Sequence, residues 1–510
     1  MSADPSANGR PIEQACFWLA ERRRESDPPL VGRREADVAV IGAGFTGLWT
    51  AIFLKRLDPK LEIVVVEQGI AAYGASGRNA GMVGESIDHS HDLAIAHFGR
   101  DEAARLARLG VENLDGLLRF LEESRIDCDL ERTGQIHVAL LPSQVDGLKE
   151  DLEVARRLGL NHFRFLDRTE VRAELDCARY EAGLLNERSC LVNPVKLVEG
   201  LKREAARAGV AFHERTRVSS IERNGDGVRL RTAHVPGIPG TESRMEATGA
   251  AATRLQAAAR RLQAAAARVQ AAVPEGAEGE LLARRAVLAT NAYTHLIFPR
   301  LLSRFIPLYD YILVSDPLTD EQMGRIGWRQ RRGVTDVRAF FKYYRLTRDN
   351  RILWGTSEAA YYAGNRVDTS CDHSEKHYAE LRDSFVRHFP SLSELQFPYA
   401  WGGPICSTTR FTPFFGTAED GRVAYGLGYT GHGVANTHLA GQILAHLTLG
   451  RPSPLLELSL VRKKPFPYPP EPLRSWSVRA VTRALRRVDA GGRPGLLLRV
   501  LDALGIGLSS

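Results

Sequence analysis

Long hydrophobic runs are missing from this sequence of 510 residues, of which 44% are hydrophobic and 25% are charged. No stretch offers the ~20 consecutive apolar residues that a helix needs to cross a bilayer. The opening residues, MSADPSANGRPIEQ, also lack the basic start and the apolar centre of a secretory signal. We therefore expect a cytoplasmic protein with no transmembrane segment, long enough for two or three hydrophobic cores.

Cysteine is scarce, and its spacing argues against two kinds of structure. No two of the six cysteines form a C-x-x-C pair. We therefore expect neither a zinc site nor a disulfide framework, and no metal at all. The cysteines are Cys16, Cys128, Cys177, Cys190, Cys371 and Cys406.

The positive charge is concentrated rather than spread over the chain. The net charge is +7, and many arginines fall in residues 21–24, in an Ala/Arg-rich stretch and in the C-terminal tail. No basic groove interleaved with aromatic residues is visible, so we expect no binding to nucleic acid.

Residues 36–54, ADVAVIGAGFTGLWTAIFL, combine a short apolar strand, a glycine turn and the start of a helix. Gly42, Gly44 and Gly47 have the G-x-G-x-x-G spacing, which lets a pyrophosphate approach the backbone at the helix N-terminus. A second strand, residues 61–66, ends at Glu67, whose carboxylate can accept hydrogen bonds from ribose hydroxyls. The segment predicts a dinucleotide site that also includes Phe45, Thr46 and Gln68.

A second glycine-rich loop, YGASGRNAGM, follows at residues 73–82. An ordinary surface loop also favours Gly and Ser. A flavin, however, needs close backbone approach at a second place, which a simple NAD domain does not. The loop therefore favours FAD, with contacts from Ser76, Gly77, Arg78, Asn79, Gly81 and Met82.

With WGGPICSTTRFTPFFG at residues 401–416 and GLGYTGHGVANTHLAGQILA at residues 426–445, these motifs resemble a known family. The chain is similar to the FAD-dependent oxidoreductases of the D-amino-acid oxidase and glycine oxidase superfamily, above all to the γ-glutamylputrescine oxidase branch. The resemblance spans about residues 14–452. It implies an α/β (α+β) fold in which a discontinuous Rossmann-like FAD-binding domain is joined to a substrate domain built on a mainly antiparallel sheet.

The domain boundaries follow from the resemblance and from the local pattern. Helical spacing at residues 100–124, a strand at 134–142 and a helix opened by Asn193 and Pro194 support them. We expect an N-terminal segment (1–35), an FAD-binding domain (36–95, 185–235, 281–304 and 397–455) and a substrate domain (96–184 and 305–396). An Ala/Arg-rich helical insertion (236–280), and a Pro-rich linker with C-terminal helices (456–510), complete the chain.

Two segments lie outside the family pattern. The insertion is a basic amphipathic helix that could bind a protein partner, or a low-complexity hairpin with none. In the tail, Trp476, Val478, Val481, Leu485 and Val488 share one helical face. We expect the tail to pack on its own protein outside the catalytic core, with docking on an anionic membrane as the alternative.

The resemblance also implies site residues. Val218 lies beside the adenine, and the GLGYTGHGV loop holds the flavin ring, where a helix N-terminus stabilises negative charge. The further cofactor residues are Thr290, Asn291, Gly428, Gly431, His432, Gly433 and Val434. Tyr343 and His432 are catalytic candidates, and Tyr309, Tyr344 and Arg345 are substrate candidates.

Departures from the family limit the choice of substrate. Residues 403–405 carry no arginine to hold a substrate carboxylate, and Ala435 stands where some relatives have lysine. A longer amine is therefore favoured over a small α-amino acid. We interpret Cys406 as a small buried strand residue rather than as an attachment point for flavin, so we expect FAD to be held non-covalently.

The implied reaction is the oxidation of a CH–NH bond by hydride transfer to flavin, with dioxygen as the expected acceptor and hydrogen peroxide as its product. An NAD-dependent dehydrogenase using the same glycine turn and a catalytically silent flavoprotein scaffold remain the alternatives.

Overall fold

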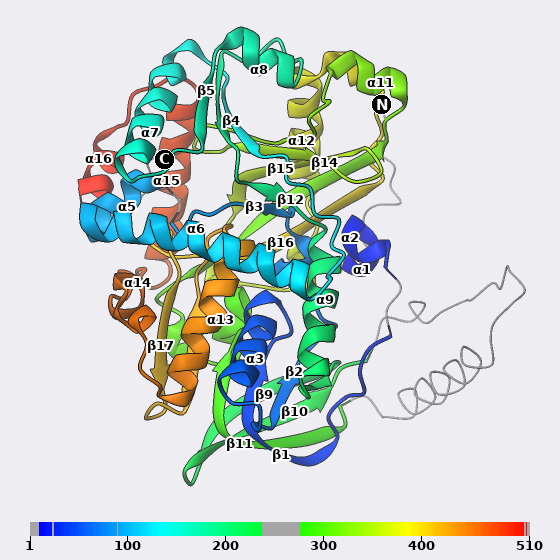
Figure 1. The fold of residues 1–510 in the computed structure, drawn as a ribbon, viewed down its shortest axis with the longest axis vertical. Helices are drawn as coiled ribbons and strands as arrows, with labels where there is room; N and C mark the ends of the chain where they lie inside the picture. Colours follow the sequence, from blue (N-terminus) through cyan, green and yellow to red (C-terminus); the bar gives the residue numbers. More distant parts are fainter. Residues whose placement is uncertain (1–9, 23–24, 89, 237–275, 504–505, 507–510) are drawn as a thin grey trace, which may run out of the picture.

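The computed structural model describes residues 10–22, 25–88, 90–236, 276–503 and 506. Two sheets of eight strands each, with helices on their faces, make up most of it (Figure 1). Figure 1 shows one sheet in the lower half of the molecule and the other in the upper half, with the long helix α6 (Arg100–Glu123) crossing between them. This arrangement agrees with the predicted α/β class and with the two predicted sheets.

The first sheet is Rossmann-like, and β1 (Gly32–Ile41) is one of its central strands. β1 pairs in parallel with β2 (Ile63–Val66) and with β11 (Glu278–Leu288). Their ends are buried on both faces, as the apolar runs predict. The sheet is completed by β17 (Phe414–Ala418), β18 (Val423–Leu427), β8 (Ala211–His213), β9 (Thr216–Asn224) and β10 (Gly227–His234).

The predicted insertion lies mostly outside the described residues, which stop at 236 and resume at 276. β11 resumes the sheet after this gap. It begins at Glu278, and β10 and β1 both pair with its first half.

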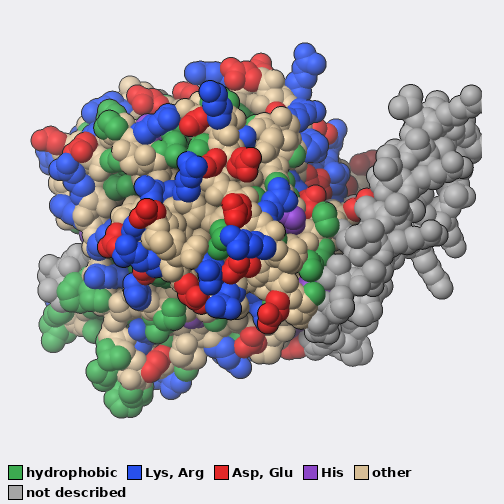
Figure 2. Space-filling model, turned by 90° about the horizontal axis from the view of Figure 1, so that it is seen from below, with side chains coloured by type: hydrophobic (Ala, Val, Ile, Leu, Met, Phe, Trp, Pro, Cys, Tyr) green, Lys and Arg blue, Asp and Glu red, His purple; other side chains and the backbone are tan. Residues whose placement is uncertain are grey.

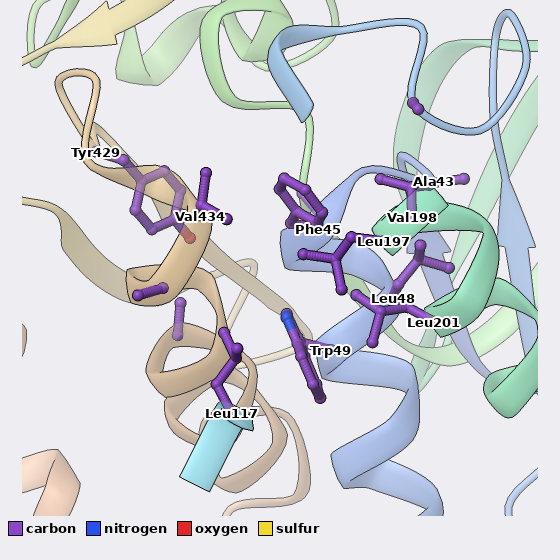
Figure 3. Close-up of a cluster of buried hydrophobic side chains, with 14 of the residues drawn as sticks. Ala43, Phe45, Leu48, Trp49, Leu117, Leu197, Val198, Leu201, Tyr429 and Val434 are labelled. Atoms are coloured by element: carbon purple, nitrogen blue, oxygen red, sulfur yellow. The ribbon is translucent and has the colours of Figure 1, made fainter. Parts of the chain in front are cut away.

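Helices α3 (Phe45–Leu57), α9 (Pro194–Arg207) and α13 (Gly433–Leu449) pack together beside this sheet (Figure 3). Trp49 of α3 lies on the side that faces α13, and a Cβ at Gly441 of α13 would sit 2.6 Å from the Trp49 Cβ. The missing side chain at Gly441 therefore lets α3 and α13 approach closely. As predicted, the Asn193 side chain caps α9 by accepting from the backbone N–H groups of Val195 and Lys196.

The second sheet is antiparallel except for one parallel pair, β4 (Gln135–Ala139) with β13 (Gly333–Asp336). Its strands run in the order β16 (Tyr399–Ser407), β12 (Ile306–Pro317), β15 (Arg351–Ala360), β14 (Lys342–Leu346), β13, β4, β6 (Ala182–Asn186) and β5 (Phe163–Leu166). A hairpin turn at residues 349–350 joins β14 to β15. Two expected boundaries need correction, because β16 and all of β6 belong to this sheet rather than to the FAD-binding domain.

The two faces of the second sheet differ. One face packs an aromatic core against α12 (Glu375–His388), with Tyr344 stacked on Trp354 at 4.3 Å between ring centroids. Along β12, Tyr309, Tyr311 and Leu313 point into this core. Leu308, Asp310 and Ile312 alternate with them and face a cavity on the other side.

No helix within the described part of the chain is long and apolar enough to cross a membrane. On the face shown in Figure 2, basic and acidic side chains are interspersed rather than gathered by sign. The α-helices not yet named are α1 (Ile12–Ala15), α2 (Phe17–Ala20), α4 (Ala75–Arg78), α5 (His91–Phe98), α7 (Val145–Arg157), α8 (Arg168–Glu174), α11 (Asp320–Ile326), α14 (Ser459–Arg462), α15 (Leu473–Asp489) and α16 (Leu496–Ala503).

The C-terminal tail packs on its own protein, as expected, but it is not separate from the catalytic core. Val478, Val481 and Leu485 of α15 line the same cavity as the glycine loops. The shared apolar face was therefore predicted correctly for Val478, Val481 and Leu485, whereas Trp476 is 60% exposed and the position of the tail outside the core was wrong.

Candidate flavin and substrate site

A cavity of about 1440 Å³ is lined by residues of both sheets. Ile41 and Val66, at the ends of β1 and β2, lie on one side of it, and Ile312 and Tyr343 of the second sheet lie on another. The predicted pyrophosphate turn opens into this cavity.

The turn has the geometry that a phosphate site needs. Gly42 has φ +105°, and a Cβ there would lie 2.8 Å from the Ala289 carbonyl oxygen. Gly44 faces Ser76, whose hydroxyl accepts a hydrogen bond of 2.9 Å from the Phe45 N–H. Gly47 does not line the cavity. A Cβ there would lie 1.9 Å from the Gly42 oxygen, so this glycine packs the helix onto the turn.

Glu67 is held at the end of β2 by two backbone N–H groups. Its carboxylate accepts from Ala43 and from Gly69, both at 2.9 Å. Burial raises the pKa of this carboxyl group. Gln68 also lines the cavity, so Glu67 and Gln68, both predicted at the cofactor site, lie where a nucleotide can reach them.

Arg78 connects the second glycine loop to the substrate sheet. Its guanidinium donates to the Tyr73 carbonyl at 2.7 Å and to the Asp372 carboxylate at 2.7 Å. Its Nη2 is buried and has no hydrogen-bond partner among the described residues. A buried donor of this kind fits a bound group that offers acceptor oxygens or nitrogens, as FAD does.

The neighbouring loop residues hold their own backbone. The Asn79 amide donates to the Ala75 carbonyl at 2.9 Å, and its Oδ1 accepts from the Gly81 N–H at 2.8 Å. Gly77 does not line the cavity, because it packs against Ala72.

Two helix N-termini meet at the cavity. Phe45 and Thr46 begin α3, Gly433 and Val434 begin α13, and Thr46 donates to the Tyr429 hydroxyl at 3.0 Å between them (Figure 3). Their first N–H groups favour negative charge, such as that of a phosphate or of a reduced flavin ring.

The other predicted residues of the C-terminal loop divide into two groups. Gly431 and His432 line the cavity, and burial lowers the pKa of His432, which favours the neutral imidazole. Gly428 does not line it, since it is packed against Thr408 with φ +90°. At the nucleotide end, Val218, Thr290 and Asn291 all line the cavity.

The substrate sheet contributes a pair that the motifs did not reveal. The Tyr343 hydroxyl donates to an Asp310 carboxylate oxygen at 2.5 Å, and both residues line the cavity. The Tyr343 ring reaches Asp310 by crossing β15 above Gly355, where a Cβ would lie 2.2 Å from the ring. Burial raises the pKa of Asp310 to about 7. The one sequence signal was a carboxylate inside the apolar run IPLYDYILV.

The three predicted substrate residues lie elsewhere, and these assignments need correction. Tyr309 and Tyr344 point into the aromatic core, where the Tyr344 hydroxyl lies 2.5 Å from that of Tyr180. Arg345 reaches behind the cofactor loop and donates to the Val192 carbonyl at 2.7 Å and to that of Gly81 at 3.3 Å. Of the tyrosines predicted on these strands, Tyr343 is the one that faces the cavity, because side chains of a strand alternate.

The described residues contain no group of three or more His, Cys, Asp or Glu side chains that could hold a metal ion.

Comparisons with known proteins agree with the nucleotide site. The family model for FAD dependent oxidoreductases matches residues 37–447. A probable oxidoreductase OrdL of Rhizobium meliloti is 29% identical, over 90% of this chain and 94% of its own length. The γ-glutamylputrescine oxidoreductase of Escherichia coli is 28% identical, over 84% of this chain and 88% of its own.

Among solved structures, glycine oxidase from Geobacillus kaustophilus superposes with a TM-score of 0.61 at 19% identity, covering 84% of this chain and 99% of that enzyme. This likeness confirms the predicted fold class. The glycine turns, the buried Arg78 donor and the two helix N-termini fit the cofactor that the family uses. The chain therefore belongs to the family of FAD-dependent oxidoreductases.

Proposed function

We propose that this enzyme oxidises the CH–NH bond of an amine that is longer than glycine. The observation that carries the proposal is the Asp310–Tyr343 pair, which places a buried carboxylate on the cavity wall formed by the substrate sheet. A carboxylate can hold a substrate ammonium and take a proton from it.

The charges around the cavity favour an amine over an α-amino acid. Arg78 and Arg338, both in the lining, are already paired with carboxylates, Arg338 with Asp336 at 2.6 Å. The remaining donor of Arg78, its Nη2, fits the cofactor, so neither guanidinium is the expected clamp for a substrate carboxylate. Asp92, Glu150 and Asp151 also line the cavity and favour a cation.

In the proposed reaction the Asp310 carboxylate takes one proton from the substrate ammonium, which leaves the neutral amine. FAD, when bound, supplies the acceptor for the hydride that leaves the α-carbon. Loss of a hydride from carbon and of a second proton from nitrogen converts the amine to an imine, which water hydrolyses to a carbonyl compound. Tyr343 acts as a positioning residue that keeps the Asp310 carboxylate in place.

Dioxygen is the proposed acceptor for the two electrons, with hydrogen peroxide as its product. The name of the Escherichia coli relative supports an elongated amine as the substrate class. We place His432 next to the flavin as a neutral donor or acceptor rather than as the proton carrier, because burial lowers its pKa.

The test is anaerobic titration of the purified holoenzyme with polyamines, γ-glutamyl amines, simple alkylamines and N-methyl amino acids. We expect the amines whose oxidised carbon bears no carboxylate to bleach the visible flavin absorbance, and air to restore it with release of hydrogen peroxide. A protein that carries no flavin would favour the NAD-dependent alternative. A flavin that no amine bleaches would favour the silent scaffold.

A further inference from the structure

We propose that the C-terminal helix α15 forms a subsite for an apolar group of the substrate, at a distance from the amine. The inference rests on the proposed amine oxidation, and it specifies which class of amine the enzyme oxidises. α15 lies beyond residues 37–447, the part matched by the family model, so the family likeness assigns no role to it.

The helix presents one uncharged face to the cavity. Val478, Val481 and Leu485 line the cavity, and their spacing of three and four residues puts them on a single face of α15. Ser477 and Thr482 line it as well, so the α15 residues of the lining carry no charge. Arg479 and Arg483 point to the exposed side.

The C-terminal end of α15 is fixed to the substrate sheet. The Asp489 carboxylate accepts from the backbone N–H groups of Ala339 and Phe340 at 2.8 and 2.9 Å. One turn earlier, Arg486 donates to Glu358 at 2.6 Å. Ala339 and Phe340 belong to the segment before β14, and both line the cavity.

The N-terminal end is fixed as well. Glu471 accepts from the Tyr361 hydroxyl at 2.6 Å and from the Gly364 N–H at 3.0 Å. The buried Arg474 donates to the Asn365 side chain at 2.9 Å. Because both ends of α15 are tied to the same domain, its inner face is a fixed wall of the cavity.

This wall continues to the amine-binding pair. Phe341 also lines the cavity, and its ring centroid lies 6.2 Å from that of Tyr343. The Tyr343 hydroxyl in turn donates a hydrogen bond to Asp310. An amine held at Asp310 can therefore extend past Phe341 toward α15. The substrate class is an amine whose distal part is an aliphatic chain or an aromatic ring without charge.

The test uses the holoenzyme and unbranched primary alkylamines of increasing length. In the wild type we expect kcat/KM to rise by about fourfold for each methylene that reaches the subsite. Val481→Trp fills the subsite and should remove this rise, so that kcat/KM no longer increases with chain length. Ala480→Trp adds the same bulk to the exposed side of α15 and should behave like the wild type.

Val481→Thr changes the polarity of the side chain with little change of its volume, and it is the second variant if Val481→Trp does not fold. It should reduce the increase of kcat/KM per methylene. A wild type that oxidises short and long amines equally well, or an Ala480→Trp protein that loses the rise as Val481→Trp does, would overturn the subsite.

A binding measurement separates this proposal from the proposed function. If no alkylamine is oxidised, the same amines are titrated against the visible flavin spectrum. Binding that tightens with chain length in the wild type but not in Val481→Trp supports the subsite although the reaction is different. Binding that is independent of chain length overturns the subsite.

Discussion

The hydroxyl of Tyr343 donates a hydrogen bond of 2.5 Å to Asp310 across an intervening strand, and this contact joins two strands of the substrate sheet that are not neighbours. β15 lies between them, and Gly355 on β15 leaves the room that the Tyr343 ring occupies. The contact therefore depends on Asp310, Tyr343 and Gly355, which lie on three different strands. Each of these residues can be tested by substitution.

Asp310→Asn should lower the rate of flavin reduction by about 10²- to 10³-fold, because the amide cannot take a proton. The pKa of Asp310 is raised to about 7, so in the wild type the carboxylate form is lost as the pH falls through that value. We expect kcat/KM, which reports the free enzyme, to decline below about pH 7 in the wild type. In Asp310→Asn this inflection should be gone, and an unchanged profile would remove Asp310 from the mechanism.

Tyr343→Phe and Tyr344→Phe delete the same atom on opposite faces of one strand. Tyr343→Phe should alter the pH profile and slow flavin reduction, since it frees the Asp310 carboxylate. Tyr344→Phe leaves the buried Tyr180 hydroxyl without its partner, and the free energy of unfolding should fall by about 1–3 kcal/mol with the kinetics unchanged. Stopped-flow reduction and chemical denaturation distinguish the two, and an exchange of these phenotypes would contradict the placement of both residues.

Gly355→Ala should act like Tyr343→Phe although it touches neither partner chemically. A Cβ at position 355 would lie 2.2 Å from the Tyr343 ring, so the ring must move off β15 and away from Asp310. The measurement is the pH profile of flavin reduction. If Gly355→Ala keeps the wild-type pH profile, the space above position 355 is not required for the contact between Tyr343 and Asp310.

Gly44→Val should yield protein without flavin. A Cβ there would lie 2.8 Å from the Ser76 hydroxyl, which holds the Phe45 N–H, and the added bulk fills the path of the phosphate. The visible absorbance of the purified protein measures the bound flavin. Gly324→Val is the matched control, because nothing lies within 4 Å of a Cβ at that position, and it should retain its flavin.

The flavin should dissociate when the protein is denatured. Cys406 lines the cavity but is 1% exposed, and burial raises its pKa well above the usual value, so its thiol stays protonated and unreactive. Cys406→Ser should bind flavin as the wild type does. Fluorescence that stays with the denatured polypeptide on a gel would show a covalent link.

The corrections in the substrate domain have one physical origin. Tyr309, Tyr343, Tyr344 and Arg345 were predicted as neighbours of the substrate from a family likeness and from their strand positions. Which side of the sheet each one faces depends on the register of β12, β14 and β15, and a shift of one residue reverses every side chain. The sequence shows that side chains alternate between the two faces of the sheet, but it does not show which face each side chain occupies.

The role of the tail was missed for a related reason. The apolar stripe of Val478, Val481 and Leu485 was visible as a helical face. The contacts that hold this helix against the cavity come from residues near 339, 358 and 364, more than 100 positions away in the chain. Periodicity predicts that a face will be covered and leaves open what covers it.

The sequence by itself determined the nucleotide turn, the acid at the end of the second strand and the two glycine loops. These are local features, since the close backbone approach and the helix start depend on residues within one short segment. Only the tertiary structure decided that Asp310 meets Tyr343 above Gly355, that Tyr344 faces away, and that α15 closes the cavity. Such contacts join distant segments, so strand register and helix docking fix them rather than any local pattern.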